Sequence, residues 1–571
     1  MEIPTRLQSM LDGEHGKTAA MAARLVVDLA HTAGATEFVE VSDAHVSGVS
    51  VITGGHGLIR FLNDLAGDGK VVIPTTLNSA GCDSRRMEEM SIEIPNFLIK
   101  QFEIIKAYED LGIEATLSCT PYDRGVDLTE GIASWAESNA VCFANSFSSL
   151  ITNRESGLSA LATALTGYAP RWGLHLEENR RPHYIVEVSA EMEDLVDWSI
   201  LGDWAGSQAP SMLEMPFGPM PAFTGLPDEI GIAQRKALAA AAANHGCPIL
   251  WIEDEIEAEI PIFQFKNSIL QECKQDLAPR GEVDLVVIGC PQASMEEIRR
   301  TASAVRSRAE FGIKVPDQRL WLFTSKYNFS LADSEGLIEL MEDAGVVILQ
   351  DTCPEVVPYN RTKYNHLLTN SMKAEHYLTS GLNRLPTSVA SIEDCVNIAF
   401  DPTLCSGERP ILADKKSHSH PTSKSHRLDD CLLRGSGLNS QGDFVIRGKA
   451  MCTDVPLTYL GYVNRDTGVV EESGHPLDGR AIEDTILIYP KGSGSTVAPY
   501  VLMGLLYTNK GPSAIVNRDV CPLTLPAASL LGLPYAHGFD DDPCLEVNDG
   551  DLVELRRVGD EVTLEVIERV S

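Results

Sequence analysis

The sequence predicts an α/β protein whose large first part is built in several layers on parallel sheets, followed by a smaller, mostly β domain. Helical and strand patterns alternate from Met1 to about Pro410. A polar stretch rich in Ser, His, Lys and Gly breaks the alternation at residues 411–442. Short strand patterns with turn residues between them then fill residues 443–571. Because alternating strands and helices form βαβ units, the first part should contain parallel sheets.

The elements of the first part follow from their periodicity. Apolar residues that recur every three or four positions predict helices, and short apolar or β-branched runs predict strands. Helices are expected at 9–33, 57–69, 97–112, 293–308 and 336–345. Strands are expected at 38–48, 70–81, 113–122, 283–290, 320–325 and 346–354. A length of 571 residues corresponds to three or four domains at about 100–200 residues each.

Residues 411–442 are interpreted as a flexible linker. His418, His420 and His426 could form a metal site there, but polar tracts between patterned segments are more often linkers. In the second domain, strands are expected at 444–452, 468–472, 484–490 and 513–520, a helix at 501–511, and a closing hairpin at 551–558 and 561–570.

Charge and composition narrow the function. The chain has 46 basic and 81 acidic residues, a net charge of −35, which argues against nucleic-acid and anionic-membrane partners. It has no apolar run of membrane-spanning length and no apolar signal core at its start, so we expect a cytoplasmic protein. The thirteen cysteines should then be mostly reduced, and no C-x-x-C pair occurs among them. The sequence does not indicate an oligomeric state.

Three cysteines share one setting, because each follows a strand pattern and has a proline one or two positions later. Cys290 ends an apolar run at a proline, which cannot donate to a sheet ladder. Cys119 in ATLSCTPY and Cys353 in LQDTCPE are placed in the same way. The carboxyl ends of parallel strands form ligand sites, so the three thiols could converge. They would suit a soft metal or an iron–sulfur centre with one open position; three unrelated buried cysteines are the alternative.

Residues 134–157 carry many amides and hydroxyls among apolar residues. We expect a helix there whose polar side chains bind a polar substrate, since buried polar groups need partners. Capping of a surface helix is the alternative. The candidates in this stretch are Glu137, Ser138, Asn145, Ser146, Thr152, Asn153 and Arg154. Similar small polar loops follow the strands at 43–48, 74–81 and 369–377.

The stretch YPKGSGSTVAPYVLMGLL, residues 489–506, predicts a strand, a Gly/Ser loop and an apolar helix that begins near Thr496. Backbone N–H groups and the Ser495 hydroxyl at a helix N-terminus can bind an anion. The spacing differs from that of a nucleotide-binding P-loop. An ordinary N-cap is the alternative reading of the loop.

Taken together, these segments resemble the aconitase X family. DAHVSGVS, VVIPTTLNSAG, SWAESNAV, TNRESG, GCP, DTCP and TNSMKAEHY are similar to the large subunit, and GHPLDGRAIEDTILIYPKGSGST to the swivelling small subunit. The resemblance implies an aconitase-like large catalytic part at 1–410 with iron ligands Cys119, Cys290 and Cys353. It further implies a swivelling domain at 443–571 whose Ser495 is the catalytic base. The arginine that follows this serine in aconitases is replaced by Val497. The paired C-x-x-C cluster cysteines of aconitases are also absent.

The resemblance implies a hydro-lyase that converts cis-3-hydroxy-L-proline to Δ1-pyrroline-2-carboxylate. A [2Fe–2S] cluster is the expected cofactor, with [4Fe–4S] or mononuclear iron as alternatives. Arg154 or Lys373 would hold the carboxylate, and His45, Asn78, Glu137 or Asn153 the ring nitrogen and hydroxyl. The other residues expected at the substrate are Ser47, Ser138, Asn145 and Thr496.

Three other functions remain open at this point. The first is dehydration of mevalonate 5-phosphate or another small hydroxy acid, which is the activity that resemblance to split archaeal members implies. The second is a non-catalytic, iron-sensing RNA-binding protein, which the net charge of −35 disfavours. The third is a metal-free binding protein for a hydroxy amino acid.

Overall fold

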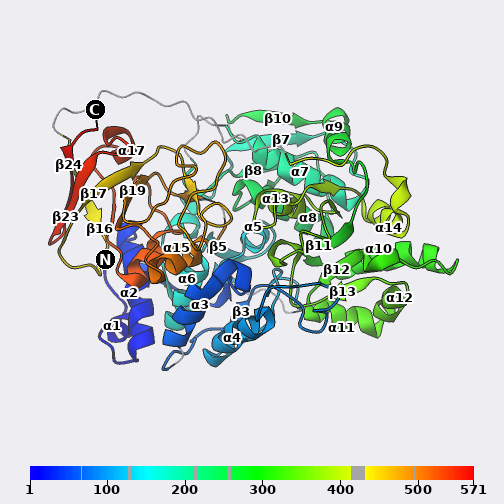
Figure 1. Cartoon of the computed structure of the whole chain (residues 1–571), viewed down its shortest axis with the longest axis horizontal. Helices are drawn as coiled ribbons and strands as arrows, with labels where there is room; N and C mark the ends of the chain where they lie inside the picture. The colour runs from blue at the N-terminus through cyan, green and yellow to red at the C-terminus, as the bar shows by residue number, and fades with distance from the viewer. Residues whose placement is uncertain are drawn as a thin grey trace.

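Three parallel sheets covered by helices and one closed barrel make up the protein (Figure 1). The computed structural model describes residues 1–571 except 66, 126–129, 211–214, 254–258, 413–430, 494 and 571. The barrel lies at one end of the molecule and the third sheet at the other (Figure 1). Among the described residues, none of the helices is both long enough and apolar enough to span a membrane.

The first sheet has the strand order β3-β2-β4-β5, and all neighbours are parallel. Its strands are β2 (Asp43–Val46), β3 (Thr75–Leu77), β4 (Gly131–Trp135) and β5 (Leu150–Arg154). Its helices are α1 (Thr5–Leu11), α2 (Lys17–Thr32), α3 (Val51–Leu65), α4 (Phe97–Asp110), α5 (Ser138–Phe147) and α6 (Gly157–Thr166). A short antiparallel pair, β1 (Phe38–Glu40) and β6 (Tyr168–Pro170), lies beside them.

The second sheet, β10-β7-β8-β9, is also parallel. Its strands are β7 (Tyr184–Val188), β8 (Pro221–Thr224), β9 (Trp251–Ile252) and β10 (Ile262–Phe265), with helices α7 (Leu195–Ser207), α8 (Ile232–Ala242) and α9 (Asn267–Leu277). The third sheet is parallel in the order β13-β12-β11-β14-β15. Its strands are β11 (Leu285–Ala293), β12 (Leu320–Thr324), β13 (Val347–Leu349), β14 (Leu367–Thr369) and β15 (Thr387–Val389). Its helices are α10 (Met295–Ala309), α11 (Lys326–Ser334), α12 (Leu337–Asp343), α13 (Met372–Ser380) and α14 (Ile392–Phe400).

The last part of the chain closes a seven-stranded barrel in the order β16-β22-β21-β19-β17-β23-β24. Its strands are β16 (Leu432–Gly437), β17 (Phe444–Cys452), β19 (Ile486–Tyr489), β21 (Ala514–Asn517), β22 (Tyr535–His537), β23 (Leu552–Val558) and β24 (Glu561–Glu568). The helices are α15 (Ala498–Tyr507), α16 (Leu525–Leu531) and α17 (Pro543–Glu546). A two-stranded pair, β18 (Leu457–Thr458) and β20 (Gly492–Ser493), leads into the serine loop.

The predicted fold class, layered α/β with parallel sheets and a mostly β C-terminal domain, is confirmed. The boundary differs, because β16 lies inside the range 411–442 assigned to a linker and pairs with β22 and β24. Because this strand contains glycine and arginine residues, its sequence looks like a polar tract, although Leu433 is buried in the barrel core. His418, His420 and His426 lie outside the described residues. The strand expected at 468–472 is present only as isolated bridges.

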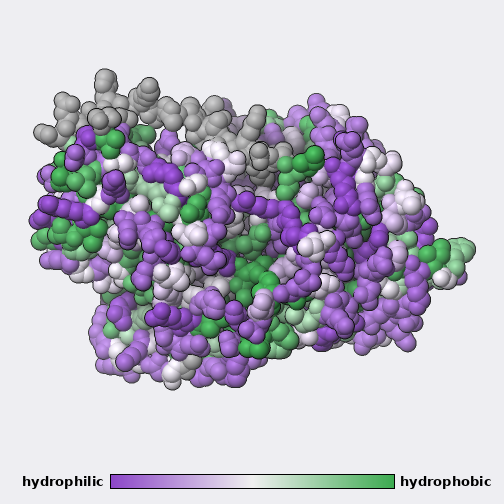
Figure 2. Space-filling model, viewed as in Figure 1, coloured by the Kyte–Doolittle hydropathy of each residue, from purple (hydrophilic) through white to green (hydrophobic). Residues whose placement is uncertain are grey.

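The barrel part is packed directly on the first α/β layer. An ideal Cβ on Gly57 of α3 would lie 2.6 Å from the Cα of Gly504 in α15, so glycine permits this close approach. Asp28 of α2 is buried and accepts hydrogen bonds from Ser440 N, at 2.8 Å, and from Ser529 Oγ, at 2.5 Å. One apolar core therefore continues from the first layer into the barrel part. On the outer face shown in Figure 2, hydrophilic side chains cover most of the surface, and hydrophobic ones gather in its middle.

Candidate active site

Cys290 lies within β11, in a local break of the sheet. The pairing of β11 with β12 shifts register between Ile288 and Ala293. Gly289 has φ +103°, and an ideal Cβ there would lie 2.2 Å from a backbone oxygen of β12, so only glycine fits. The predicted strand end at Cys290 is wrong, since β11 continues to Ala293. The ladder is nevertheless interrupted at the cysteine, as a proline neighbour requires.

Cys119 and Cys353 reach the same interior from different loops. Cys353 follows β13 as predicted. Cys119 does not follow a regular strand: its segment runs along β3 through a bridge at Glu114, and Leu117, with φ +49°, breaks the extended conformation. A hydrogen bond with Cys119, followed by burial, raises the pKa of the Cys353 thiol well above its ordinary value. The nearby Cys119 and Cys290 sulfurs raise this pKa further. The three buried thiols therefore interact with one another.

A buried charged cluster stands next to Cys290. The Nζ of Lys373 lies 3.2 Å from Oε1 of Glu137 and 3.4 Å from Oε1 of Glu355. Lys373 also donates to Ser138 Oγ at 3.2 Å, and its Nζ lies 4.9 Å from the ring centre of Tyr377. The Cys290 thiol donates to Glu355 Oε1 at 3.3 Å. This cluster links the helix α5, the helix α13 and the cysteine loops.

Amide side chains complete the surroundings of Glu137. Asn78 Nδ2 donates to Oε2 at 2.7 Å, and Asn139 Nδ2 donates to Oε1 at 2.7 Å. Asn139 also donates to the Cys119 carbonyl at 3.1 Å. Glu137 is the N-cap of α5, so its position follows from ordinary helix-capping chemistry. The amides connect the charged cluster to the thiols through Cys119.

The charges in this cluster depend on one another. Burial raises the pKa of Glu137, but Lys373 and the amide donors outweigh this effect and leave the pKa below its ordinary value. Burial likewise lowers the pKa of Lys373, and the two carboxylates reverse that shift to well above its ordinary value. Burial raises the pKa of Glu355, and the charge of Lys373 only partly offsets this rise. Lys373 and Glu137 thus form a fixed buried ion pair.

The serine loop of the barrel domain docks beside this cluster. Thr496 Oγ1 donates to the carbonyl of Ala136, the residue before Glu137, at 2.7 Å. Gly157 N donates to the Thr496 carbonyl at 3.1 Å, and the hydroxyls of Ser47 and Thr496 lie 3.3 Å apart. Contacts between residues more than 300 positions apart in sequence therefore place this loop.

Ser495 precedes these docking contacts and is partly buried. Its hydroxyl accepts a hydrogen bond from Val497 N at 3.4 Å. The helix α15 begins at Ala498, two residues later than predicted, with Val497 as its N-cap. The first N–H groups of the helix are already engaged, because Ala498 N donates to the Ser495 carbonyl and Tyr500 N to the Val497 carbonyl, each at 3.1 Å, and Pro499 has no N–H.

His45 lies in β2 and pairs with Trp135 of β4, the residue before Ala136, on which the serine loop docks. Its Nδ1 lies 2.8 Å from Thr76 Oγ1, and its Nε2 is buried with no hydrogen-bond partner among the residues that the structure describes. Burial lowers the pKa of His45 to about 3, although Glu137 opposes that shift. The imidazole is therefore neutral, and Nε2 remains able to bond with a bound molecule.

Asn145 and Asn153 have other work in the structure. Asn145 Nδ2 donates to the carbonyls of Thr152 and Pro248, and its Oδ1 accepts from Thr152 N at 3.0 Å. Asn153 Oδ1 accepts from Leu174 N at 2.7 Å. Their amides hold backbone, which favours a structural role over the predicted substrate contact. The predicted single helix at 134–157 is also wrong, because this stretch forms β4, α5 and β5.

Arg154 ends β5 and is half-buried. Its positive charge lowers the pKa of Tyr377, although burial dominates and raises it. Arg154 therefore lies within electrostatic range of the tyrosine that also faces Lys373. The structure brings together Asn78, Glu137, Ser138 and Lys373 near the thiols, and places Ser47, Thr496 and Ser495 at the adjoining loop.

Sequence reasoning missed Glu355, Asn139 and Tyr377. Glu355 lies two residues after Cys353 in an otherwise apolar segment, and Tyr377 lies one helical turn after Lys373. Those two spacings were the available signals. Asn139 stands inside the polar stretch that was recognised, but only the tertiary structure shows that it contacts Cys119.

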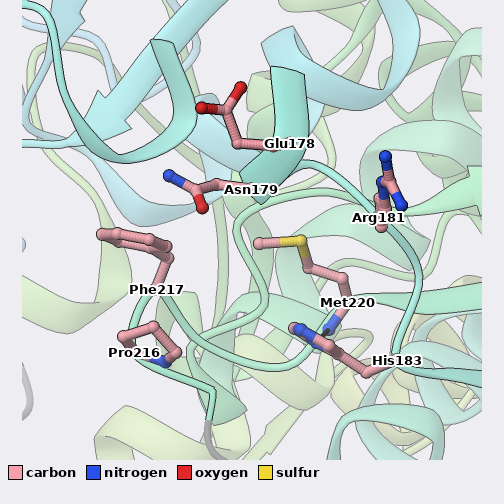
Figure 3. A pocket seen from close by; sticks show the side chains of 7 residues that line it. All are labelled: Glu178, Asn179, Arg181, His183, Pro216, Phe217 and Met220. Carbon is pink, nitrogen blue, oxygen red and sulfur yellow. Dashed lines mark hydrogen bonds between the residues drawn. The ribbon is translucent and has the colours of Figure 1, made fainter. Parts of the chain in front are cut away.

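Two pockets lie away from this cluster. One, of about 120 Å³, is lined by Glu178, Asn179, Arg181, His183, Pro216, Phe217 and Met220 (Figure 3). Phe217 packs edge-on against Trp172, which accepts a hydrogen bond from Asn153. The other, of about 420 Å³, lies between the second and third layers and includes Lys274 and Arg308. The lining of neither pocket includes Cys119, Cys290 or Cys353.

The donor set fits an iron centre in its chemistry. Three buried thiols from three loops are soft ligands of the type that iron–sulfur centres use. Among the residues that the structure describes, no group of three or more His, Cys, Asp or Glu side chains is already placed to hold a metal ion. Instead, the Cys353 thiol hydrogen-bonds with Cys119, and the Cys290 thiol donates to Glu355.

Known relatives of this chain are dehydratases. The large subunit of phosphomevalonate dehydratase from Methanothermobacter thermautotrophicus is 35% identical over 65% of this chain and 92% of its own length. Cis-3-hydroxy-L-proline dehydratase from Pseudomonas aeruginosa is 31% identical over 69% of each chain. The crystal structure of Thermococcus kodakaraensis aconitase X in its holo-form has a TM-score of 0.62 and 31% identity, covering 70% of this chain and 100% of that one. The fold and these relatives define a hydro-lyase.

Family models give the particular family. Aconitase X first domain matches residues 1–178, aconitase X third domain matches 283–401, and aconitase X swivel domain matches 439–566. The chain belongs to the aconitase X family. The large and small parts are thus joined in one chain, and a separate relative, the phosphomevalonate dehydratase small subunit of Methanococcoides burtonii, is 36% identical over 19% of this chain.

Proposed function

We propose that this hydro-lyase dehydrates cis-3-hydroxy-L-proline to Δ1-pyrroline-2-carboxylate. The observation that carries the proposal is the continuous set of contacts from the serine loop through Ala136, Glu137 and Lys373 to Cys290. It joins a hydroxyl at a helix end, a buried ion pair and a thiol donor set in one place. These are the groups that removal of a proton and a hydroxyl from a small polar substrate needs.

Cys119, Cys290 and Cys353 would hold the iron centre, with a [2Fe–2S] cluster favoured over [4Fe–4S] or a single iron. Bound there, the centre would supply Lewis-acid chemistry toward the leaving hydroxyl. The sulfur ligands bind as thiolates, so loading the centre releases protons from the buried thiols. Lys373 is close enough to Cys290 to lower the pKa of its thiol, although burial dominates and raises it.

Ser495 would accept the proton from Cα. A serine hydroxyl is a weak base, so its environment must stabilise the negative charge that develops on Oγ. The Val497 N–H already donates to that oxygen, at 3.4 Å. Docking of Thr496 on Ala136 fixes the loop and so restricts the positions that the Ser495 hydroxyl can take.

Lys373 would bind the substrate carboxylate, and Glu137 the ring ammonium group. In the structure Lys373 donates to the Glu137 carboxylate, and Glu137 accepts from Lys373 and Asn78. A zwitterionic imino acid offers the same kinds of group, a carboxylate for Lys373 and an ammonium group for Glu137. His45 Nε2, Asn78 and Ser138 are the neighbouring groups available for the ring nitrogen and hydroxyl, and Arg154 is a second candidate for the carboxylate. In this cluster two carboxylates already share Lys373, which disfavours an additional phosphate dianion.

A second candidate is dehydration of mevalonate 5-phosphate, because five archaeal phosphomevalonate dehydratase large subunits are 31–35% identical to this chain. The fused architecture favours the hydroxyproline reaction. The aligned stretch is 92% of the first of these subunits but only 69% of the Pseudomonas aeruginosa dehydratase, whose chain continues further.

The test is anaerobic incubation with cis-3-hydroxy-L-proline and, separately, mevalonate 5-phosphate, with iron and sulfide measured on the same sample. Formation of Δ1-pyrroline-2-carboxylate by the iron-loaded protein, and its loss in Ser495→Ala with unchanged iron content, is the expected result. Turnover retained in Ser495→Ala would remove the serine from the reaction. Turnover of only the phosphorylated substrate would replace the substrate assignment.

A further inference from the structure

Gln292 occupies a position where the three cysteine-bearing loops meet. It lies two residues after Cys290 in β11 and is completely buried. Its Nε2 donates to the carbonyl of Leu117 at 3.3 Å and to the carbonyl of Thr352 at 3.0 Å. Leu117 lies two residues before Cys119, and Thr352 directly precedes Cys353.

The backbone of Gln292 adds a contact to a thiol itself. Its N–H donates to Cys119 Sγ at 3.4 Å. Hydrogen bonds from N–H donors to cysteine sulfurs are one way in which proteins orient and tune metal ligands. Gln292 therefore contacts the Cys119 sulfur through its backbone N–H. Its side chain contacts the carbonyls of Leu117 and Thr352, which lie in the segments of Cys119 and Cys353.

The segment that carries Gln292 is held from behind by a buried ion pair. Lys236 Nζ donates to the carbonyls of Pro291 at 3.2 Å and Gln292 at 2.7 Å, and it pairs with Glu297. Glu297 accepts from Ser294 N at 2.9 Å. This clamp replaces the sheet hydrogen bonds that the register shift in β11 removes, so the Gln292 side chain has a fixed origin.

The orientation of the Gln292 amide is determined by its partners. Both neighbours of Nε2 are carbonyl oxygens, so the NH₂ group must face them, because a flipped amide would oppose oxygen to oxygen. Its Oε1 is buried with no partner in the described part of the chain, and leaving a buried acceptor unpaired carries a free-energy cost. The side chain bridges the segments of Cys119 and Cys353 in spite of this cost. We therefore attribute its role to the geometry that the bridge imposes on these two segments.

We propose that Gln292 is a positioning residue that ties together the segments carrying Cys119, Cys290 and Cys353 and so keeps the three thiols near one another. This inference rests on the proposed function for the identity of the metal, but the assembly of the thiols concerns the metal-free chain. Without the two N–H donors, the Cys290 strand loses its side-chain bridge to the segments that carry Cys119 and Cys353. Removal of an outer-shell partner of this kind typically lowers metal affinity by about 10- to 100-fold.

The first experiment uses the full-length, metal-free protein and three variants. Gln292→Met keeps the length but removes both donors, and Gln292→Glu keeps the shape but places an oxygen against the two carbonyls. Gln101→Met is the matched control, because Gln101 is buried and its Nε2 donates to the Val49 carbonyl, at 2.9 Å, outside the cysteine loops. Iodoacetamide labelling followed by peptide mass spectrometry gives the rate for each cysteine separately.

The proposal predicts that both Gln292 variants raise the labelling rates of Cys119, Cys290 and Cys353 at least 5-fold relative to the buried Cys142 and Cys247. These two cysteines report any global loosening of the fold. Gln101→Met should change all five rates alike or not at all. Equal changes at all five cysteines in the Gln292 variants would overturn the proposal.

A titration with Co²⁺, read from the thiolate-to-cobalt absorption, separates this inference from the proposed function. Wild type should bind, and the Gln292 variants should need about 10- to 100-fold more Co²⁺. Equal affinity in wild type and variants would overturn the positioning role while leaving the dehydratase proposal intact. No thiolate absorption in wild type, combined with selective labelling in the variants, would overturn the metal centre but support the positioning role.

Discussion

The hydroxyl of Thr496 donates a 2.7 Å hydrogen bond to the carbonyl of Ala136, and this contact joins the barrel domain to the charged cluster. Ala136 precedes Glu137, whose carboxylate is paired with Lys373. The serine that precedes Thr496 is thereby held one residue away from the docking point. Thr496 and Ala136 are both buried, so breaking this bond would leave a buried polar group unpaired, and the loop position depends on it.

Thr496→Val should lower kcat by about 10- to 100-fold, because a valine cannot donate to Ala136 and a loop displaced by about 1 Å loses orientation of its hydroxyl. Iron content should stay at the wild-type value, since the thiols lie on the other side of the interface. Steady-state kinetics on iron-loaded protein measures this. Thr508→Val, at the exposed far end of α15, is the control. A normal kcat in Thr496→Val would show that packing alone holds the loop.

Lys373→Met should destabilise the protein by about 3–5 kcal/mol, since it leaves Glu137 and Glu355 buried without their cation. Turnover should be lost as well. Adding Glu355→Gln to this variant should recover part of the stability, because one of the two uncompensated carboxylates is then neutral. Urea unfolding followed by circular dichroism measures the change in each protein. An unchanged urea midpoint in the single variant would mean that water reaches the cluster.

Asn145→Ala should reduce stability without changing KM. Its amide satisfies three backbone groups, including the Pro248 carbonyl, and leaving buried groups unpaired costs about 1–3 kcal/mol each. Thermal unfolding and KM on the same preparation provide the two readouts. Asn78→Ala is the comparison, since Asn78 donates to Glu137 and its loss should affect kinetics. A raised KM in Asn145→Ala would return that residue to the substrate site.

Glu472→Gln should stabilise the protein at pH 8 and have no such effect at pH 4. Burial raises the pKa of Glu472 to about 7, Asp478 adds to the shift, and Arg384 opposes it. Within the described ranges its Oε2 has no hydrogen-bond partner, and the nearby Tyr462 offers no opposite charge. The folded state holds the proton more tightly than the unfolded one, so stability falls as pH rises from about 4.5 to 7.

Glutamine removes this loss because it does not ionise. The carboxyl is only partly buried, so we expect about 1 kcal/mol at pH 8, which corresponds to a few degrees in Tm. Melting curves of wild type and variant from pH 4 to pH 8 measure the difference. A constant gap between the two proteins over that range would contradict the assignment.

Periodicity predicted most of the regular elements. α4, α10 and α12 lie where apolar residues recur at helical spacing, and β12 and β19 where β-branched and aromatic runs occur. The predictions fell short where tertiary contacts decide the backbone. Leu117 at positive φ ends the expected strand before Cys119, and β16 is polar by composition yet is completed by β22 and β24.

The candidate site was predicted in part. Residue types and spacing pointed to the three cysteines, to Lys373 and to the serine loop. Asn145 looked equivalent to Asn78 in sequence, and only the hydrogen bonds show that one amide faces backbone and the other faces Glu137. Glu355 and Gln292 were not recognised, because their spacing of two positions from a cysteine is the only local signal and is too common to single out one residue.

The sequence by itself determined the fold class, the family resemblance and the kind of chemistry, because those depend on periodicity and on local motifs that survive without knowledge of partners. The tertiary structure alone decided which polar groups meet. Glu137, Lys373 and Glu355 are separated by up to 236 positions in the chain, and Gln292 reaches Leu117 across 175. Such contacts arise when sheets and barrel pack together, since burial then forces each polar group to find a partner that the local sequence does not name.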